Sequence, residues 1–335
     1  MNKDTNIFIT GASGFIGSNL AKIAINEGYK VYALIRTSSP QSEELKSQGV
    51  ILLYGDLCVK ADLENVFSHL NDLDIKINYV IHAAGLTKAN SFADFINVNV
   101  NGTSNLLDAL NKYEIKLSKL IFVSSLAASG PEELENVIKI GHQRPVTNYG
   151  KSKLLAENIV KSNNTIPYII FRPTAVYGSG EKDLYTLFKL IKKGINPLIG
   201  FGEQKLTFIN VTDLCRLLIS ALQSPIKNDI FFATDGMVYD KKALGFEISK
   251  ALNKRIVTIK IPLTIVKFIA LITEVAAKNL GKVSPLNLDK CKELSAESWH
   301  CDVNETFEKL NYRPSITLER GVRETIKWYK ENNWI

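Results

Sequence analysis

Two residues with complementary acid–base chemistry, Tyr149 and Lys153, stand four positions apart in the segment Tyr149-Gly150-Lys151-Ser152-Lys153. We expect this segment to begin a helix. At about 100° per residue, the offset then leaves the two side chains about 40° apart on one face. An ammonium beside a phenol favours the phenolate and lowers the phenol pKa from its ordinary value of about 10. Tyr149 is therefore expected to exchange a proton with an alcohol or carbonyl near neutral pH.

A pair of hydroxyls lies upstream of this helix. Ser124 and Ser125 stand at the end of the predicted strand 119–124, the last strand before the helix. A hydroxyl at that place would hydrogen-bond the oxygen on which Tyr149 acts and stabilise the charge that develops there. The residues themselves leave open which of the two serines has this role.

A glycine-rich turn follows the first predicted strand, Ile7–Thr10, and leads into a predicted helix. Glycines in such a turn allow close approach to a pyrophosphate, which the free N–H groups and the dipole of the new helix then hold. We expect dinucleotide binding at Gly11, Ser13, Gly14, Phe15, Ile16 and Gly17. Lys153 would then also hold the nicotinamide ribose hydroxyls.

The second predicted strand bears on the choice of dinucleotide. Where the cofactor is NAD, a carboxylate near the end of this strand is expected to bind the adenosine 2′-OH. This chain has Ile35 there, followed by Arg36 and three hydroxyl residues. Because a guanidinium matches a 2′-phosphate, we expect NADP, with NAD as the alternative.

The elements that must position these residues alternate regularly in the first half of the chain. Buried strands are predicted at 7–10, 30–35, 50–54, 79–82, 119–124 and 168–171, and helices at 15–26, 61–70, 92–113 and 149–161. Such alternation predicts an α/β fold, a doubly wound Rossmann sheet of parallel strands covered by helices. Ligands then bind beyond the carboxyl ends of the strands, where the residues named above stand.

The second half has shorter elements and more glycine and proline turns, which predicts a smaller substrate lobe interleaved with the first. We expect residues 1–172 to form the NAD(P)-binding domain with the catalytic residues. Residues 173–335 are expected to form mainly the substrate lobe, with some segments returning to the Rossmann domain.

Composition narrows the class of protein. The 335 residues carry 41 Lys and Arg against 34 Asp and Glu, a diffuse excess of +7 that fits anionic small ligands without a nucleic-acid motif. The four cysteines lack CxxC or metal-ligand spacing, so we expect free thiols and no metal. The N-terminal residues 1–6 lack an apolar core of a signal peptide, and no stretch approaches a spanning helix, so we expect a cytoplasmic protein.

The motifs together resemble those of the extended short-chain dehydrogenase/reductases, also called the NAD-dependent epimerase/dehydratase family. The resemblance rests on the TGxxGxxG loop, on the Tyr149 and Lys153 pair, and on Ser125, five residues before Gly130 as in the family's Ser-x-x-x-x-G segment. It extends over nearly the whole chain, through Arg172–Gly178, Phe208–Asp213 and Leu310–Pro314. It implies that Ser125 is the catalytic hydroxyl, with Tyr149 and Lys153 as its partners.

The same resemblance implies further cofactor contacts. Gly55-Asp56-Leu57 is similar to the segment whose Asp contacts the adenine, and His82-Ala83-Ala84-Gly85 to the loop that approaches the ribose. Asn99, in Asn99-Val100-Asn101-Gly102-Thr103, matches the family residue that holds the site backbone. We add Pro173 to the cofactor contacts and expect His82 to be structural.

The resemblance also bears on the reaction. Family dehydratases have two acids and decarboxylases a carboxylate after the catalytic hydroxyl, where this chain has Leu126 and Ala127. In the epimerases a diphosphate-binding Arg stands where this chain has Leu206, with Lys205 beside it. The pattern is closer to the 3β-hydroxysteroid dehydrogenase and dihydroflavonol reductase branches. We expect an oxidoreductase that interconverts a secondary alcohol and ketone on a small, fairly apolar substrate. The alternatives are a nucleotide-sugar epimerase and a non-catalytic NAD(P)-binding scaffold.

The stretch 261–280 is apolar nearly all round, interrupted by Lys267 and Glu274. Such a helix is normally buried. Three interpretations remain: packing in the core or in a dimer, a cover over an apolar substrate pocket, and peripheral membrane contact. The family resemblance implies a homodimer through the helices predicted at 92–113 and 149–161.

Overall fold

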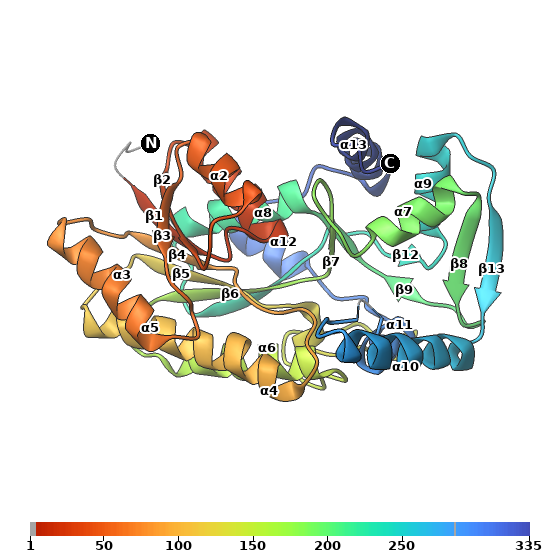
Figure 1. Cartoon of the computed structure of the whole chain (residues 1–335), viewed down its shortest axis with the longest axis horizontal. Coiled ribbons are helices and arrows are strands. Elements are labelled where there is room, and N and C mark those ends of the chain that lie inside the picture. Colours follow the sequence, from red (N-terminus) through yellow and green to blue (C-terminus); the bar gives the residue numbers. More distant parts are fainter. Residues whose placement is uncertain (1–4, 285) are drawn as a thin grey trace.

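The computed structural model describes residues 5–284 and 286–335, and its centre is a seven-stranded sheet (Figure 1). All neighbouring strands are parallel, in the order β11-β6-β5-β4-β1-β2-β3. Residues 1–4, on which part of the signal-peptide prediction rests, lie outside the described residues. The strands are β1 (Asn6–Thr10), β2 (Lys30–Ile35), β3 (Ile51–Tyr54), β4 (Tyr79–His82), β5 (Lys119–Val123), β6 (Tyr168–Pro173) and β11 (Asp229–Ala233).

This architecture confirms the predicted Rossmann fold, with one strand more than the sequence indicated. The added strand, β11, comes from the second half of the chain and pairs with β6 at the sheet edge. The strand order reverses between β1 and β4. Strand β1 pairs with β2 on one side and with β4 on the other. In a doubly wound sheet, this reversal opens the crevice in which a dinucleotide binds.

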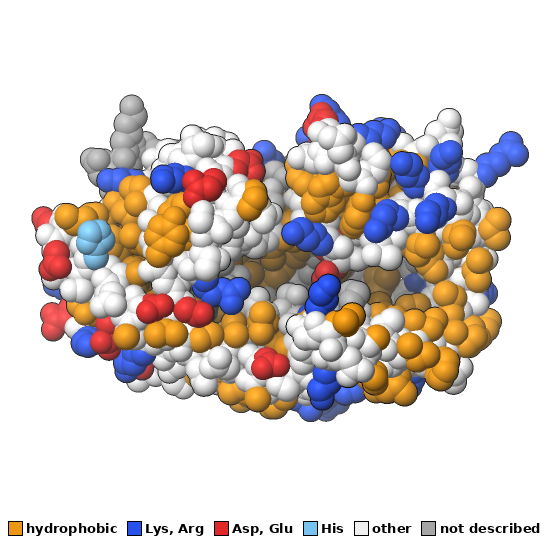
Figure 2. Space-filling model, in the orientation of Figure 1, with side chains coloured by type: hydrophobic (Ala, Val, Ile, Leu, Met, Phe, Trp, Pro, Cys, Tyr) orange, Lys and Arg blue, Asp and Glu red, His pale blue; other side chains and the backbone are white. Residues whose placement is uncertain are grey.

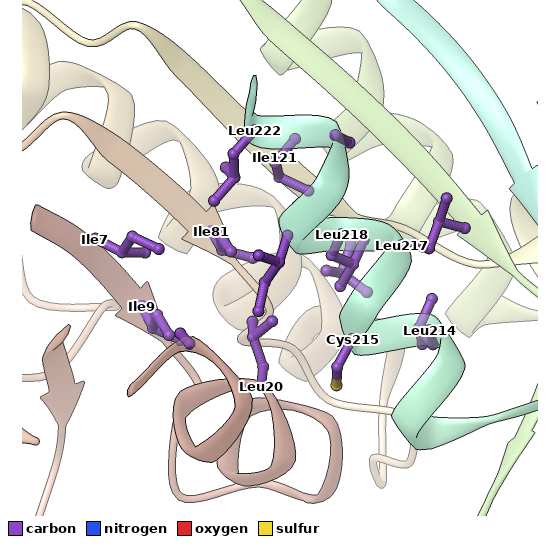
Figure 3. Close-up of a cluster of buried hydrophobic side chains, with 14 of the residues drawn as sticks. Ile7, Ile9, Leu20, Ile81, Ile121, Leu214, Cys215, Leu217, Leu218 and Leu222 are labelled. Carbon is purple, nitrogen blue, oxygen red and sulfur yellow. The ribbon is translucent and has the colours of Figure 1, made fainter. Parts of the chain in front are cut away.

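Alternation along the strands divides the core into two layers. Ile7 and Ile9 of β1 face one side of the sheet, and Phe8 faces the other, because successive side chains point in opposite directions. The first side is covered by α1 (Phe15–Asn26) and α8 (Val211–Gln223), as Figure 3 shows for Leu20 of α1 and Leu218 of α8. The second side is covered by α3 (Lys60–Asp72), α5 (Gly102–Lys112) and α6 (Asn148–Ser162). Helix α2 (Pro40–Ser47) lies on the first side, where its Leu45 joins the layer of Ile7 and Ile9.

The helix predicted at 92–113 is not uniform. It comprises α4 (Phe92–Phe95), a π-helical segment η1 (Ile96–Asn101) and α5. Such π-helical segments often occur at functional sites, because the wider turn re-aims a side chain. Here the segment carries Asn99, which is 2% exposed.

The second lobe is built from small sheets and helices around an aromatic cluster that includes Tyr177, Phe188 and Tyr329. Its strands are β7 (Ala175–Tyr177), β8 (Ile195–Ile199), β9 (Lys205–Leu206), β10 (Phe208–Asn210), β12 (Tyr239–Asp240) and β13 (Val257–Ile261). Its helices are α7 (Tyr185–Lys192), α9 (Ala243–Leu252), α10 (Leu263–Asn279), α11 (Leu288–Leu294) and α13 (Leu318–Glu331), while α12 (Asn304–Leu310) contacts β11 of the main sheet.

The apolar helix α10 lies on the outside of the molecule (Figure 1). Within it, only Val266 and Ala270 are buried, and most of its large apolar side chains are exposed. The expectation that this stretch packs in the core of the chain is therefore wrong, because one narrow stripe of the helix suffices to attach it. Among the described residues, no helix is long and apolar enough to cross a membrane.

Candidate active site

The glycine-rich turn between β1 and α1 is folded back on itself. A Cβ atom at Gly17 would lie 2.1 Å from the Gly11 carbonyl oxygen, and one at Gly11, whose φ is +75°, would lie 2.6 Å from the Ala84 nitrogen. Only glycine fits either position. Because Gly14 offers no side chain to cap α1, and Ser13 and Gly14 are exposed, the helix N-terminus remains open to an anion.

His82 joins this turn to the neighbouring loop. Thr103 Oγ1 donates to the Asn99 carbonyl at 2.7 Å and therefore accepts from His82 Nε2 at 2.9 Å. The other ring nitrogen, Nδ1, accepts the Thr10 hydroxyl at 2.6 Å, and Thr10 in turn accepts the Ala84 N–H. Burial lowers the pKa of His82 to about 3, so the ring stays neutral. This histidine is structural, as we expected.

Asn99 fixes the loop after β4 against the catalytic helix. Its Oδ1 accepts the Leu86 N–H at 2.7 Å, and its Nδ2 donates to the Leu86 carbonyl and to Ser152 Oγ. Between these residues runs Gly85, where an added Cβ would lie 3.1 Å from Asn99 Oδ1 and 3.6 Å from Lys153 Nζ. The loop 83–85 and Lys153 therefore lie side by side.

The end of β5 meets α6 at three consecutive residues. Lys153 Nζ donates to the Val123 carbonyl at 2.7 Å, Ser124 Oγ donates to Glu157 at 2.5 Å, and the Ser125 hydroxyl faces the Tyr149 phenol. On α6 the three partners Tyr149, Lys153 and Glu157 are spaced by four residues, which places them along one face.

This arrangement separates the roles of the two serines. Ser124 is buried and hydrogen-bonded to Glu157, whereas Ser125 is partly exposed and faces the phenol.

The close approach of α6 to the turn η2 (Leu126–Ala128) requires glycine at position 150. A Cβ atom at Gly150 would lie 2.2 Å from the Ala127 carbonyl oxygen.

A buried ion pair holds α6 on the sheet. The Arg172 guanidinium of β6 donates to both carboxylate oxygens of Glu157, at 2.9 and 2.7 Å, and neither side chain is exposed. Its remaining nitrogen donates to Ser129 Oγ and to the Ile140 carbonyl. The pair therefore connects β6, α6 and the loop after β5.

The electrostatics of Tyr149 differ from our expectation. Burial of its hydroxyl is the main cause that raises the pKa of Tyr149 to about 12. The negative charge of Glu293 also raises this pKa, whereas the interaction with the Ser125 hydroxyl lowers it. Lys153 does not lower it, because its ammonium is directed to the Val123 carbonyl and lies over the Phe122 ring, 4.5 Å from its centroid. The predicted lowering of this pKa is wrong, and the phenol is protonated at neutral pH.

The pKa of Lys153 is lowered, whereas that of Tyr149 is raised. It is 4% exposed, and burial lowers the pKa of its ammonium to about 8, while the negative charge of Glu157 one turn away opposes this shift. The ammonium is therefore present below about pH 8 and is lost above it.

The second lobe reaches the catalytic helix through α11. The Asp289 carboxylate accepts the Asn148 N–H at 2.7 Å, and Glu293 accepts the hydroxyl of Thr147, the residue that caps α6, at 3.3 Å. Both contacts lie beside Tyr149, so α11 forms part of the wall of the site. Figure 2 shows the surface hollowed at the centre of the molecule, between the two lobes.

The predicted adenosine contacts lie at the ends of β2 and β3. Arg36 is exposed there, while the hydroxyls of Ser38 and Ser39 are engaged with Glu43 and with the cap of α2. Asp56 accepts the Cys58 N–H, and the Leu57 side chain packs on Gly102. Pro173 is buried at the end of β6. All these candidates lie at the carboxyl ends of strands of the sheet.

The segment that carries Lys205 and Leu206 is tied to the chain after α11. Lys205 donates its N–H to the Glu297 carbonyl, and its ammonium lies 3.3 Å from Glu135. Leu206 packs against the aromatic cluster of the second lobe. The position that holds an arginine in the epimerases is therefore an apolar contact in this chain.

Comparison with known proteins identifies the family. The model described as "NAD dependent epimerase/dehydratase family" matches residues 7–231. The chain belongs to this family. Its predicted membership of the extended short-chain dehydrogenase/reductases is thereby confirmed, and family members are NAD-dependent enzymes.

Relatives and solved structures cover the chain almost end to end. It is 27% identical to a putative UDP-glucose 4-epimerase of Methanocaldococcus jannaschii, over 98% of this chain and 99% of the relative. It is 24% identical to a decarboxylating sterol-4-alpha-carboxylate 3-dehydrogenase of Saccharomyces cerevisiae, over 99% of each. The crystal structure of Thermus thermophilus UDP-glucose 4-epimerase in complex with NAD superposes with a TM-score of 0.76 at 20% identity, covering 97% of this chain and 99% of that one.

The residues present fit the dinucleotide of the family. A cradle without Cβ atoms at Gly11 and Gly17, an uncapped helix N-terminus at Gly14 and the adjacent loop 83–85 suit a pyrophosphate and a ribose. Sequence reasoning missed Glu157 and the role of Arg172. The four-residue spacing from Tyr149 through Lys153 to Glu157 was the available signal, since it places a carboxylate on the catalytic face.

Replacing Glu157 by Gln is expected to lower the free energy of unfolding by about 3–5 kcal/mol, because the buried Arg172 charge loses its counter-ion. Urea denaturation monitored by circular dichroism measures the change. The matched control is Glu44→Gln, which breaks the exposed pair with Lys22 and should cost less than about 1 kcal/mol. Equal losses in the two variants would contradict the role assigned to Glu157.

Proposed function

We propose that this protein is an NAD(P)-dependent oxidoreductase that interconverts a secondary alcohol and a ketone on a small, fairly apolar substrate. One observation carries the proposal: Ser125, Tyr149 and Lys153 meet where β5 ends, beside the loop 83–85 that would hold the nicotinamide ribose. When bound, the nicotinamide supplies or takes the hydride. The chain's own residues manage the proton and the oxygen.

In the reductive direction, the protonated Tyr149 phenol donates its proton to the ketone oxygen. Ser125 hydrogen-bonds the same oxygen and stabilises the charge that builds on it. The Lys153 ammonium, held by the Val123 carbonyl, would hold the ribose hydroxyls. The raised pKa of Tyr149, about 12, favours this direction, since the group begins as an acid.

The residues next to Ser125 support redox chemistry without elimination. Leu126 and Ala127 follow it, and both are buried, so no carboxylate stands where a dehydratase needs one. Leu206 and its apolar surroundings support an apolar substrate over a diphosphate. One relative is named a sterol-4-alpha-carboxylate 3-dehydrogenase, and a sterol skeleton is largely apolar.

The second candidate is a nucleotide-sugar epimerase, in which the hydride returns to the opposite face of the ketone. It is favoured by the similarity to UDP-glucose 4-epimerases in sequence and in fold.

We also propose, from the family resemblance, a homodimer through the outer faces of α5 and α6, where Leu155 is 41% exposed.

Purified protein incubated with NADPH and a panel of apolar ketones should consume the reduced cofactor in proportion to alcohol formed. Absorbance of the reduced nicotinamide and chromatography of the product measure this. Tyr149→Phe should lower kcat at least about 100-fold and leave NADPH binding unchanged, because only the proton donor is lost.

Two other outcomes would contradict the oxidoreductase. Interconversion of UDP-sugars with no net change in reduced cofactor identifies the epimerase. NADPH binding without turnover of either substrate class, and no effect of Tyr149→Phe, identifies a scaffold.

The pH profile of ketone reduction should follow Lys153. Because burial lowers the pKa of its ammonium to about 8, kcat/KM is expected to be level below that pH and to fall about tenfold per unit above it. Initial rates in buffers of constant ionic strength test this. Lys153→Met should be slow at every pH and should lack the decline, and retention of the decline would assign it to another group.

Arg36 is proposed to select NADP over NAD. Arg36→Ala should weaken NADPH binding at least about tenfold and leave NADH binding within about twofold, because only NADPH carries the 2′-phosphate. Quenching of protein fluorescence on titration gives both dissociation constants. A wild-type protein that binds NADH more tightly, or equal losses for both cofactors, would contradict this role.

A further inference from the structure

Six large apolar side chains cover the outer side of α10, which we call the apolar face of α10. Each of the six is 43–65% exposed: Ile265, Phe268, Ile269, Leu271, Ile272 and Val275. Two apolar side chains of the preceding strand β13 are also exposed, Val257 at 68% and Ile259 at 46%. Figure 2 shows hydrophobic side chains gathered at the lower right, over the position of α10 in Figure 1.

The apolar face is held outward by a separate buried stripe. Val266 and Ala270 pack against Cys291 of α11, and Thr273 donates to the Leu286 carbonyl at 2.9 Å. At about 100° per residue, the buried stripe and the apolar face occupy different sides of the helix. The helix is therefore attached along one side and presents its other apolar side to the surroundings.

The charge around this face is strongly positive. The segment 260–282, which runs from the end of β13 through α10, contains four basic residues and one acidic residue. No ion pair with a described residue involves any of the four: Lys260, Lys267, Lys278 and Lys282. The one carboxylate, Glu274, accepts the Leu288 N–H.

Two of these lysines border the apolar face directly. Lys267 and Lys278 are eleven residues apart, which places them within about 20° of each other on the helix. They stand between the buried stripe and the exposed apolar side chains. Lysines at such a border extend their ammonium groups to lipid headgroups while their alkyl chains lie on the apolar surface.

We propose that the apolar face of α10 docks on the surface of an anionic lipid bilayer. The helix would lie in the plane of the interface, with Phe268 and Ile272 inserted among the acyl chains. The unpaired cations would contact anionic headgroups. The charge of the surroundings selects this occupant, since apolar area alone would not distinguish a lipid from a protein.

A second copy of the chain fits this face poorly. In a two-fold symmetric pair, each α10 would meet its own counterpart, and the basic rims would be brought together. Like charges opposed across an interface disfavour association. An anionic bilayer instead neutralises the same charges.

The docked surface lies next to the active site. Through α11, the carboxylates of Asp289 and Glu293 contact the start of α6, so the membrane-binding element and the catalytic helix share one wall. Docking itself requires no turnover, and its test is independent of the proposed function.

Full-length protein should co-sediment with vesicles of phosphatidylcholine and phosphatidylglycerol, and at least about tenfold less with phosphatidylcholine alone. Raising the salt concentration should release it. Phe268→Glu should abolish binding. Phe246→Glu, a phenylalanine of similar exposure on α9, should leave it unchanged. Circular dichroism confirms that both variants are folded.

A second pair of variants tests the charge. Lys267→Glu with Lys278→Glu should lower binding to the anionic vesicles at least about tenfold, whereas Lys46→Glu with Lys330→Glu, the same change in net charge elsewhere, should not. Equal binding to both vesicle types, or no binding to either, would overturn the proposal. A Phe268→Glu variant that halves the mass seen by light scattering would show that a second copy covers the face.

Discussion

The ion pair between Glu157 and Arg172 is the constraint on which the catalytic geometry depends. Both side chains are fully buried, so each charge is tolerated only because the other compensates it. The pair fixes α6 against β6 in rotation and in register. Once α6 is fixed, Tyr149 and Lys153, two turns and one turn earlier on the same face, meet Ser125 and Val123 at the end of β5.

Burial also determines the protonation states in the site. The Tyr149 hydroxyl and the Lys153 ammonium are both removed from water, which disfavours the charged form of each. The phenol is therefore protonated at neutral pH. The lysine is close to its transition from ammonium to amine. The polar partners Ser125 and Val123 hold each group in place without removing these shifts.

Segments far apart in the sequence complete the site. The loop after β4 is held by Thr10 and Asn99, and the first turn of α6 is held by α11 from the end of the second lobe. The same lobe presents α10 outward with its unpaired lysines. Helix α11, which contacts the start of α6, and helix α10, which carries the proposed lipid-binding surface, thus pack together as one unit.

The sequence by itself determined the parallel sheet, the glycine turn and the Tyr149–Lys153 pair, because period and spacing within one element are local properties. Assigning Ser125 over Ser124 needed the family resemblance, and only the tertiary structure gives the physical reason, since Glu157 takes the Ser124 hydroxyl. The exposure of α10 and the raised pKa of Tyr149 were likewise decided by packing. Burial depends on which distant segments cover a side chain, and no local pattern contains that information.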